Sequence, residues 1–140
     1  MIGSTQLLRQ QGLRATGPRL AVLAWLQAHP KPVSADGLHL KLKGEVIDRV
    51  TVYRILESLR TAGLVRTVDL GHGHAHYEYN DPKRHHHHLV CQECGDVRDV
   101  VVPEEERLVQ RLAKRHRFSL RSHSFELFGV CRSCQVTSPA

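Results

Sequence analysis

Two Cys-x-x-Cys pairs constrain this 140-residue chain more than any other feature. The first pair is Cys91 and Cys94, and the second is Cys131 and Cys134. Two thiolates separated by two residues can reach one tetrahedral ion from a tight turn, so two such pairs predict a closed, structural four-sulfur zinc site. The residues between the pairs must then fold so that the site ties the C-terminal strand to the rest of its lobe. Disulfides are the alternative, but this spacing suits a metal better than a cross-link.

Four consecutive histidines, at positions 85–88, precede the first cysteine pair. On an extended segment, side chains alternate between two faces, so His86 and His88 point one way while His85 and His87 point the other. One stretch can therefore contribute to two metal sites, and imidazole suits zinc, iron, nickel or copper. Carboxylates that could complete such sites lie nearby in the sequence, at positions 78, 99 and 104–106. A solvated histidine loop is the alternative.

Charge divides the chain into two chemically different halves. Residues 1–66 hold ten Lys and Arg against four acidic residues, whereas residues 67–140 hold ten of each, together with nine of the eleven histidines. The first half therefore carries the whole excess of +6. A basic half beside a neutral half rich in metal ligands indicates one lobe for a polyanion and another for a metal.

The first half has the pattern of a winged helix-turn-helix domain over residues 1–80. The cap candidates Thr16 and Ser34, together with apolar spacing, predict helices from Thr16 to about His29, from Ser34 to Leu42 and from about Asp48 to Ala62. Two alternating segments, 64–68 and 75–79, flank a glycine-rich turn and predict the β-hairpin of the wing.

A polar segment broken by proline, residues 81–84, predicts a hinge before a second lobe over residues 85–140. In that lobe, Leu89-Val90 and residues 97–102 are expected to be strands, residues 103–114 a helix and residues 119–130 a long strand. The chain is thus expected to be an α+β protein, with an N-terminal winged-helix domain and a C-terminal α/β dimerisation domain that holds the structural zinc.

The third helix carries the candidate DNA contacts. Thr51, Tyr53 and Arg54 lie near its start, where helix-turn-helix proteins present side chains to base edges and phosphates. Arg14 and Arg19 are better placed for the DNA backbone, which contributes affinity without sequence information.

Several other classes of protein are disfavoured. No apolar run approaches the length of a membrane span and no leader segment is evident, so we expect a cytoplasmic protein without a membrane partner. A zinc hydrolase is the enzymatic alternative, but there is no His-Glu-x-x-His pattern and no nucleophile constellation, so we expect neither an enzyme nor a small organic substrate. A zinc-binding protein-interaction module is the other alternative, and the localised basic charge argues against it.

In order along nearly the whole chain, several motifs resemble the ferric uptake regulator superfamily. These are Thr16-Gly17-Pro18-Arg19, Thr51-Val52-Tyr53-Arg54, Ala62-Gly63-Leu64-Val65, the segment from His85 to Gly95, and His123-Ser124-Phe125 with Gly129-Val130-Cys131. The resemblance implies a homodimeric transcriptional repressor of metal homeostasis genes that binds double-stranded operator DNA when loaded with metal.

The resemblance also implies two further metal sites. A regulatory site at the hinge would use Glu78, His86, His88 and Asp99, and a second site within the dimerisation lobe would use His85, His87, Glu106 and His123. The regulatory metal would be zinc, iron, manganese or nickel.

This chain departs from the family pattern where a further ligand is expected. Pro32, Arg66 and Asn80 stand at positions where iron or zinc sensors of the family commonly place a ligand. Possible replacements are four residues of the wing: Asp69, His72, His74 and His76.

Overall fold

The computed structural model describes residues 2–137, with the side chains of residues 2–136. Residues 138–140, the end of the expected second lobe, lie outside this range. The chain divides into two compact units, and the division falls between Lys83 and Arg84, within the segment expected to be the hinge. Each unit is described by itself below.

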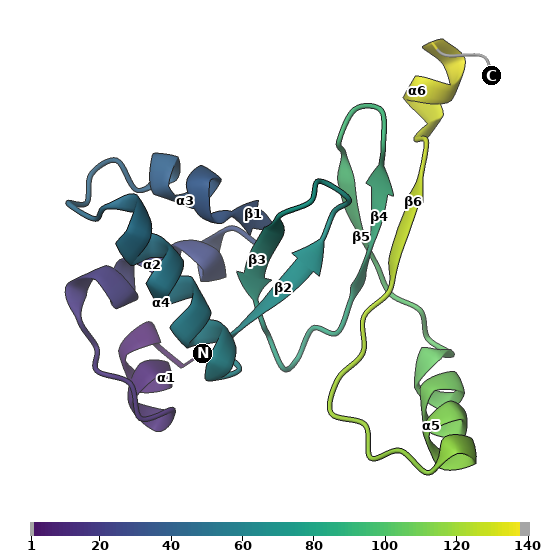
Figure 1. Cartoon of the computed structure of the whole chain (residues 1–140), viewed down its shortest axis with the longest axis horizontal. Helices are drawn as coiled ribbons and strands as arrows, with labels where there is room; N and C mark the ends of the chain where they lie inside the picture. Colours follow the sequence, from purple (N-terminus) through teal and green to yellow (C-terminus); the bar gives the residue numbers. More distant parts are fainter. Residues whose placement is uncertain (1, 138–140) are drawn as a thin grey trace. The chain divides into compact units, whose positions relative to one another are not determined.

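Four helices build most of the first unit (Figure 1): α1 Ser4–Gln10, α2 Gly17–Ala28, α3 Ala35–Lys41 and α4 Arg49–Thr61. Two of the expected helices start after the predicted caps Thr16 and Ser34, and the third starts after Asp48. The side chain of each of these residues accepts a hydrogen bond from a backbone amide of the first turn. Helix α1 was not predicted.

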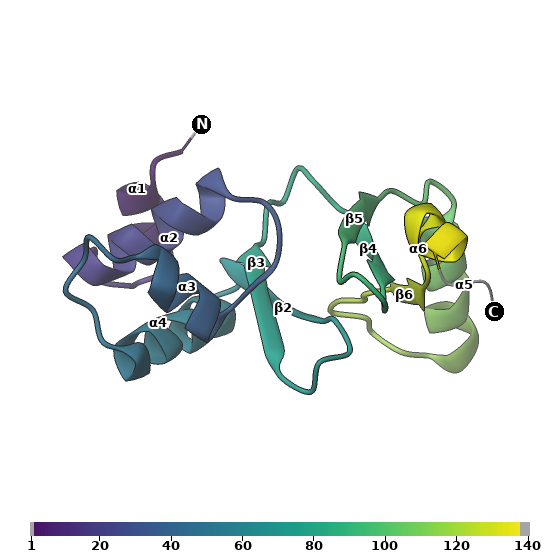
Figure 2. The ribbon, with the colours of Figure 1, turned by 90° about the horizontal axis from the view of Figure 1, so that it is seen from above.

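The wing is part of a small antiparallel sheet. Strands β1 (Val33–Ser34), β2 (Val65–Asp69) and β3 (Ala75–Tyr79) are ordered β1-β3-β2. Gly71 and Gly73, both with positive φ, allow the chain to turn between β2 and β3. The resulting hairpin extends past the helices of the unit (Figure 2).

The wing is joined to α4 through both apolar packing and a hydrogen bond. Val52, Ile55, Leu56 and Leu59 form the buried stripe of α4, as their spacing predicted, and they share a core with Tyr77 of β3. The hydroxyl of Tyr77 donates to Oε2 of Glu57 on α4 at 2.9 Å. Strand β3 of the wing and α4, the helix that carries the predicted DNA contacts, are therefore fixed to each other.

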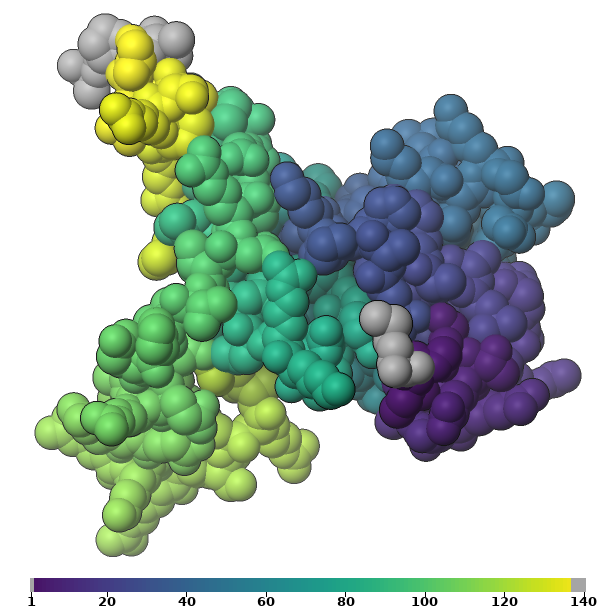
Figure 3. Space-filling view, turned by 180° about the vertical axis from the view of Figure 1, so that it is seen from behind, coloured from purple at the N-terminus to yellow at the C-terminus, as the bar shows by residue number. Residues whose placement is uncertain are grey.

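The second unit contains a three-stranded sheet and two helices. Its elements are β4 His87–Cys91, β5 Val97–Val100, α5 Glu105–His116, β6 Glu126–Gly129 and α6 Arg132–Thr137. The sheet order is β5-β4-β6, with β5 antiparallel and β6 parallel to β4. Helices α5 and α6 lie at opposite ends of this unit (Figures 1 and 3).

The prediction of a long strand over residues 119–130 was wrong, because only Glu126–Gly129 forms β6. A strand needs a partner for its backbone groups, and β4 offers only four positions, from His88 to Cys91, to pair with it. Helix α6 was also missed.

The two units differ in how much apolar surface they bury. The hydrophobic core gathers side chains from α1 to β3, all in the first unit. In the second unit, by contrast, many large apolar side chains are exposed: Leu89, Val101, Val102, Leu108, Leu112, Phe118, Leu120, Phe125, Leu127, Phe128, Val130 and Val136. Among the described helices, none has the length and apolar character that a bilayer span requires.

Candidate metal centres and nucleic-acid interface

The four cysteines converge at one end of the sheet of the second unit. Parallel pairing of β4 with β6 places Cys91 opposite Gly129, so Cys131 follows beside Cys91. The backbone amide of Cys131 donates to Sγ of Cys91 at 3.3 Å, and the sulfurs of Cys94 and Cys131 lie 3.8 Å apart. All four sulfurs lie within 4.8 Å of one another, and all four thiols are free.

This arrangement fits a tetrahedral zinc ion better than disulfides. Zinc–sulfur bonds of about 2.3 Å place neighbouring sulfurs about 3.8 Å apart, whereas a disulfide requires about 2.05 Å. Hydrogen bonds from the amides of Cys131 and Cys94 lower the pKa of Cys91 to about 6, whereas the neighbouring thiol of Cys131 and then burial raise the pKa of Cys134 to about 12. The first thiolate therefore forms readily, while the last needs a cation beside it.

A second cluster, which we call the inner cluster, consists of His85, His87, Glu105 and His123. One ligand atom from each residue lies within 4.8 Å of the others. Nε2 of His123 lies 3.0 Å from Nε2 of His85 and 3.2 Å from Oε1 of Glu105, and both His85 and His87 contact the same carboxylate. The set offers three nitrogens and a carboxylate, which suits zinc and similar divalent ions.

The carboxylate of the inner cluster is Glu105, so the prediction of Glu106 at this site was wrong. Helix α5 turns its buried stripe, Glu105, Val109 and Ala113, inward at a spacing of four residues. Glu106 is exposed, about 100° further round the helix, and its Oε1 accepts from Nε2 of Gln110 at 3.1 Å. The stripe that ends in Val109 and Ala113 was the signal in the sequence that could have identified Glu105.

The histidines of the inner cluster stabilise the negative charge of the buried Glu105 carboxylate. Burial by itself raises the pKa of Glu105, but the hydrogen bond from His123 and the charges of His87 and His85 outweigh it and lower the pKa below the usual value. Burial lowers the pKa of His87. Among the described residues, Nε2 of His87 and Oε2 of Glu105 are buried without a hydrogen bond and face each other, as ligand atoms of a metal site would.

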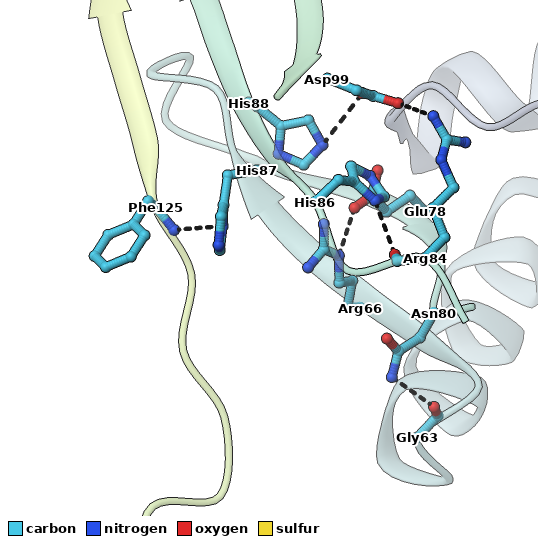
Figure 4. Close-up of polar contacts among 10 residues, drawn as sticks. All are labelled: Gly63, Arg66, Glu78, Asn80, Arg84, His86, His87, His88, Asp99 and Phe125. Atoms are coloured by element: carbon cyan, nitrogen blue, oxygen red, sulfur yellow. Dashed lines mark hydrogen bonds and ion pairs between the residues drawn. The ribbon is translucent and has the colours of Figure 1, made fainter. Parts of the chain in front are cut away.

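One contact sets a condition for metal binding at His87. The amide of Phe125 donates to its Nδ1 at 3.0 Å (Figure 4), so the neutral ring carries its proton on Nε2. For Nε2 to bind a metal, it must first lose this proton, and the amide of Phe125 must donate to another acceptor.

Changing Glu105 to Gln is expected to weaken zinc binding at the inner cluster by at least about 10- to 100-fold, the loss typical of removing a residue that only supports a ligand, because here a direct anionic ligand is lost. The neighbouring change Glu106→Gln serves as the matched control and should leave zinc affinity unaltered. Isothermal titration of both variants, with the cysteine site already loaded, measures the difference. Weaker binding in the Glu106 variant alone would contradict the assignment.

The other two histidines of the run, His88 on β4 and His86 just before it, turn away from the inner cluster, and their ring centroids lie 5.1 Å apart. Nδ1 of His86 lies 3.1 Å from the carbonyl oxygen of Arg84 (Figure 4), so donation of its proton leaves Nε2 able to bind a metal. Asp99 pairs with His88 across the strands, with 3.9 Å between Oδ1 and Nε2, and also contacts Arg84.

Glu78, the remaining residue of the expected regulatory set, lies on β3 of the first unit. Its carboxylate pairs with Arg66, which stands directly opposite on β2 (Figure 4). At Arg66, where the family resemblance led us to expect a metal ligand, the chain therefore supplies a cation to Glu78 instead.

The start of α4 presents the candidate DNA contacts. Tyr53 and Arg54 are exposed beside the buried Val52, and Thr51 is half-buried, with its amide bound to the cap Asp48. Among the described residues, Arg54 belongs to no ion pair, whereas Arg49 and Arg60 pair with Asp36 and Glu57. Arg14 and Arg19 lie together before and within α2, where Nη1 of Arg19 donates to the carbonyl oxygen of Arg14 at 3.2 Å.

A winged-helix unit followed by a unit with clustered cysteines and histidines defines the class of metal-responsive transcriptional regulators. The model of the Ferric uptake regulator family matches residues 10–128. The chain therefore belongs to the ferric uptake regulator family. Members of this family are transcriptional regulators and not enzymes, which confirms the regulator reading over that of a hydrolase.

Individual relatives agree with this membership. A ferric uptake regulation protein of Legionella pneumophila is 35% identical over 134 residues, which cover 94% of this chain and 98% of the relative. The crystal structure of the Vibrio cholerae ferric uptake regulator matches with a TM-score of 0.76 and 35% identity, covering 91% of this chain and 98% of that one. A zinc uptake regulator complexed with zinc and DNA matches with a TM-score of 0.68 and 26% identity, covering 96% and 92%.

Proposed function

We propose that this chain is a metal-dependent repressor of metal homeostasis genes, and that a homodimer binds operator DNA through the start of α4 when the hinge site is occupied. The observation that carries the proposal is the exposed pair Tyr53 and Arg54 at the start of α4, a helix of the basic unit that is anchored by a buried stripe. Helix-turn-helix proteins read base edges from this position.

The DNA-binding surface combines two kinds of contact. Arg54 is able to form a bidentate pair with guanine, and Tyr53 can contact a thymine methyl or a phosphate. Thr51, Arg14 and Arg19 supply contacts to the DNA backbone, which add affinity for any sequence. The concentration of the net positive charge in residues 1–66 supports this assignment.

The regulatory site that we propose consists of Glu78, His86, His88 and Asp99. The buried imidazoles of His86 and His88, with Asp99 opposite His88 on β5, present three of the four ligands in one unit, while Glu78 belongs to the other. A divalent ion bound to all four would join the two units and shift the population toward the arrangement that fits the operator, by no more than its difference in affinity for the two states. Zinc, iron, manganese and nickel all suit this mixed set of nitrogen and oxygen ligands.

Dimerisation follows from the incomplete core of the second unit. Phe118, Leu120, Leu127 and Phe128 are between 43% and 71% exposed, and leaving such side chains in water costs about 1.5 to 3 kcal/mol each. A second copy of the chain would cover this surface. Because the partner of such a dimer is genomic DNA, we place the protein in the cytoplasm.

Changing Arg54 to Ala is expected to weaken operator binding by about 1 to 3 kcal/mol, roughly 5- to 150-fold, because a base contact is lost. The metal content should not change. Fluorescence anisotropy with a labelled promoter duplex measures the affinity, and metal analysis checks the content.

Arg60→Ala is the matched control, since Arg60 lies on the same helix but is paired with Glu57. If Arg54→Ala binds the operator as the parent protein does, Arg54 does not belong to the interface. An equal loss on operator and random DNA would assign Arg54 to the phosphate backbone instead.

A further inference from the structure

Three histidines of the wing, His72, His74 and His76, form a cluster that the sites described above do not use. They alternate with Gly73 and Ala75, so His74 and His76 project on the same face where the chain enters β3. Their ring centroids lie 4.7 to 5.8 Å apart, and one ligand nitrogen from each lies within 4.8 Å of the others. All three belong to the first unit.

The burial of His76 distinguishes this cluster from a loop whose histidines merely face water. Its side chain lies on β3 and is only 8% exposed, and among the described residues its buried Nδ1 has no hydrogen-bond partner. A buried polar atom without a partner costs about 1 to 3 kcal/mol, so its retention calls for a compensating ligand.

His74 is oriented for the same role. Its Nδ1 lies 3.2 Å from the carbonyl oxygen of His72, and donation of the Nδ1 proton leaves the lone pair of Nε2 available. Histidines that bind metals commonly donate their other nitrogen to a carbonyl in this way. His72 and His74 are exposed, so their rings have room for the small shifts that would bring the nitrogens to the separation of about 3.3 Å expected around one ion.

We propose that His72, His74 and His76 form a binding site for a divalent late transition-metal ion within the wing itself. Three imidazoles favour nickel, copper or zinc over magnesium or calcium, which prefer oxygen ligands. The Asp69 carboxylate, at the end of β2, accepts from the amide of Gly71 at 2.8 Å and adds negative charge at the base of the same turn. Metal at this site would fasten the turn to β3 and stiffen the wing.

The test uses the full-length protein with its cysteine site loaded with zinc, and Ni²⁺ as the probe. In isothermal titration, the double variant His72→Ala/His74→Ala is expected to bind one Ni²⁺ fewer per chain than the parent protein. Both residues are exposed, so the fold should be kept, and equal thermal unfolding of the two proteins checks this. His39→Ala, a histidine of the same unit outside the wing, is the control and should keep the parent stoichiometry.

A second measurement locates the ion. Amide signals of Gly71 and Gly73 are expected to shift or broaden during the Ni²⁺ titration of the parent protein and of the His86→Ala/His88→Ala variant, but not of the wing variant. Because the site lies in one unit, it should bind even if the proposed regulation through the hinge is wrong. Unchanged stoichiometry in the wing variant, or wing signals that do not respond in the parent, would overturn the proposal.

Discussion

Replacing Cys94 with Ser is expected to release about one tightly bound zinc ion per chain and to dissociate the dimer. The four sulfurs join the end of β6 to the turn after β4 within the second unit. Zinc in such a site contributes on the order of 10 kcal/mol to folding. Because many apolar side chains of this unit are exposed, its own hydrophobic core contributes little stability in place of the zinc. Metal analysis and light scattering after gel filtration measure both effects.

The matched control for this variant is Gln92→Ser, which makes the same kind of change inside the same Cys-x-x-Cys turn. Gln92 is exposed, and its backbone amide donates to the carbonyl oxygen of Gly129 at 2.8 Å, a contact that the substitution keeps. Its zinc content and dimer should match those of the parent protein. A stable dimer of the Cys94 variant with a full complement of zinc would show that the cysteines do not hold the structural metal.

The double change His86→Ala/His88→Ala is expected to abolish the increase in operator affinity that metal produces, while the zinc of the cysteine site remains. A coupling of about 1 to 3 kcal/mol between metal and DNA, roughly 5- to 150-fold in affinity, would be lost. The reason is that these two imidazoles, whose ring centroids lie 5.1 Å apart, supply both nitrogen ligands of the proposed regulatory site. Operator affinity measured with and without added metal gives the result.

His85→Ala/His87→Ala provides the comparison, because it removes two imidazoles of the same four-histidine run that belong to the inner cluster instead. We expect this variant to lose metal at the inner cluster and to alter dimer stability, with a milder change in switching. The wing variant His72→Ala/His74→Ala should still switch. If both β4 variants lose switching equally, or if the His86 and His88 variant responds to metal like the parent, the division of the histidine run into two sites is wrong.

Local sequence patterns predicted most of the secondary structure. The three predicted helices of the first unit begin at Thr16, Ser34 and Asp48 because each capping side chain satisfies amides within its own first turn, an interaction that depends only on neighbouring residues. Helix α1 was not predicted, because its N-cap, Gly3, has no side chain that could cap the first turn. The alternation of His85 to His88 between two faces likewise followed from the period of a strand.

What the sequence determined by itself was the chemistry: which residues could bind a metal or DNA, and roughly which faces of their own elements they occupy. Only the tertiary structure decided which of them meet, because that depends on pairing between distant segments. Parallel pairing of β4 with β6 brings Cys131 to Cys91, and the direction in which α5 turns its buried stripe selects Glu105 over Glu106 as the partner of His123. The burial of His76, which distinguishes a candidate ligand from a solvated side chain, also arises only when β3 takes its place in the sheet.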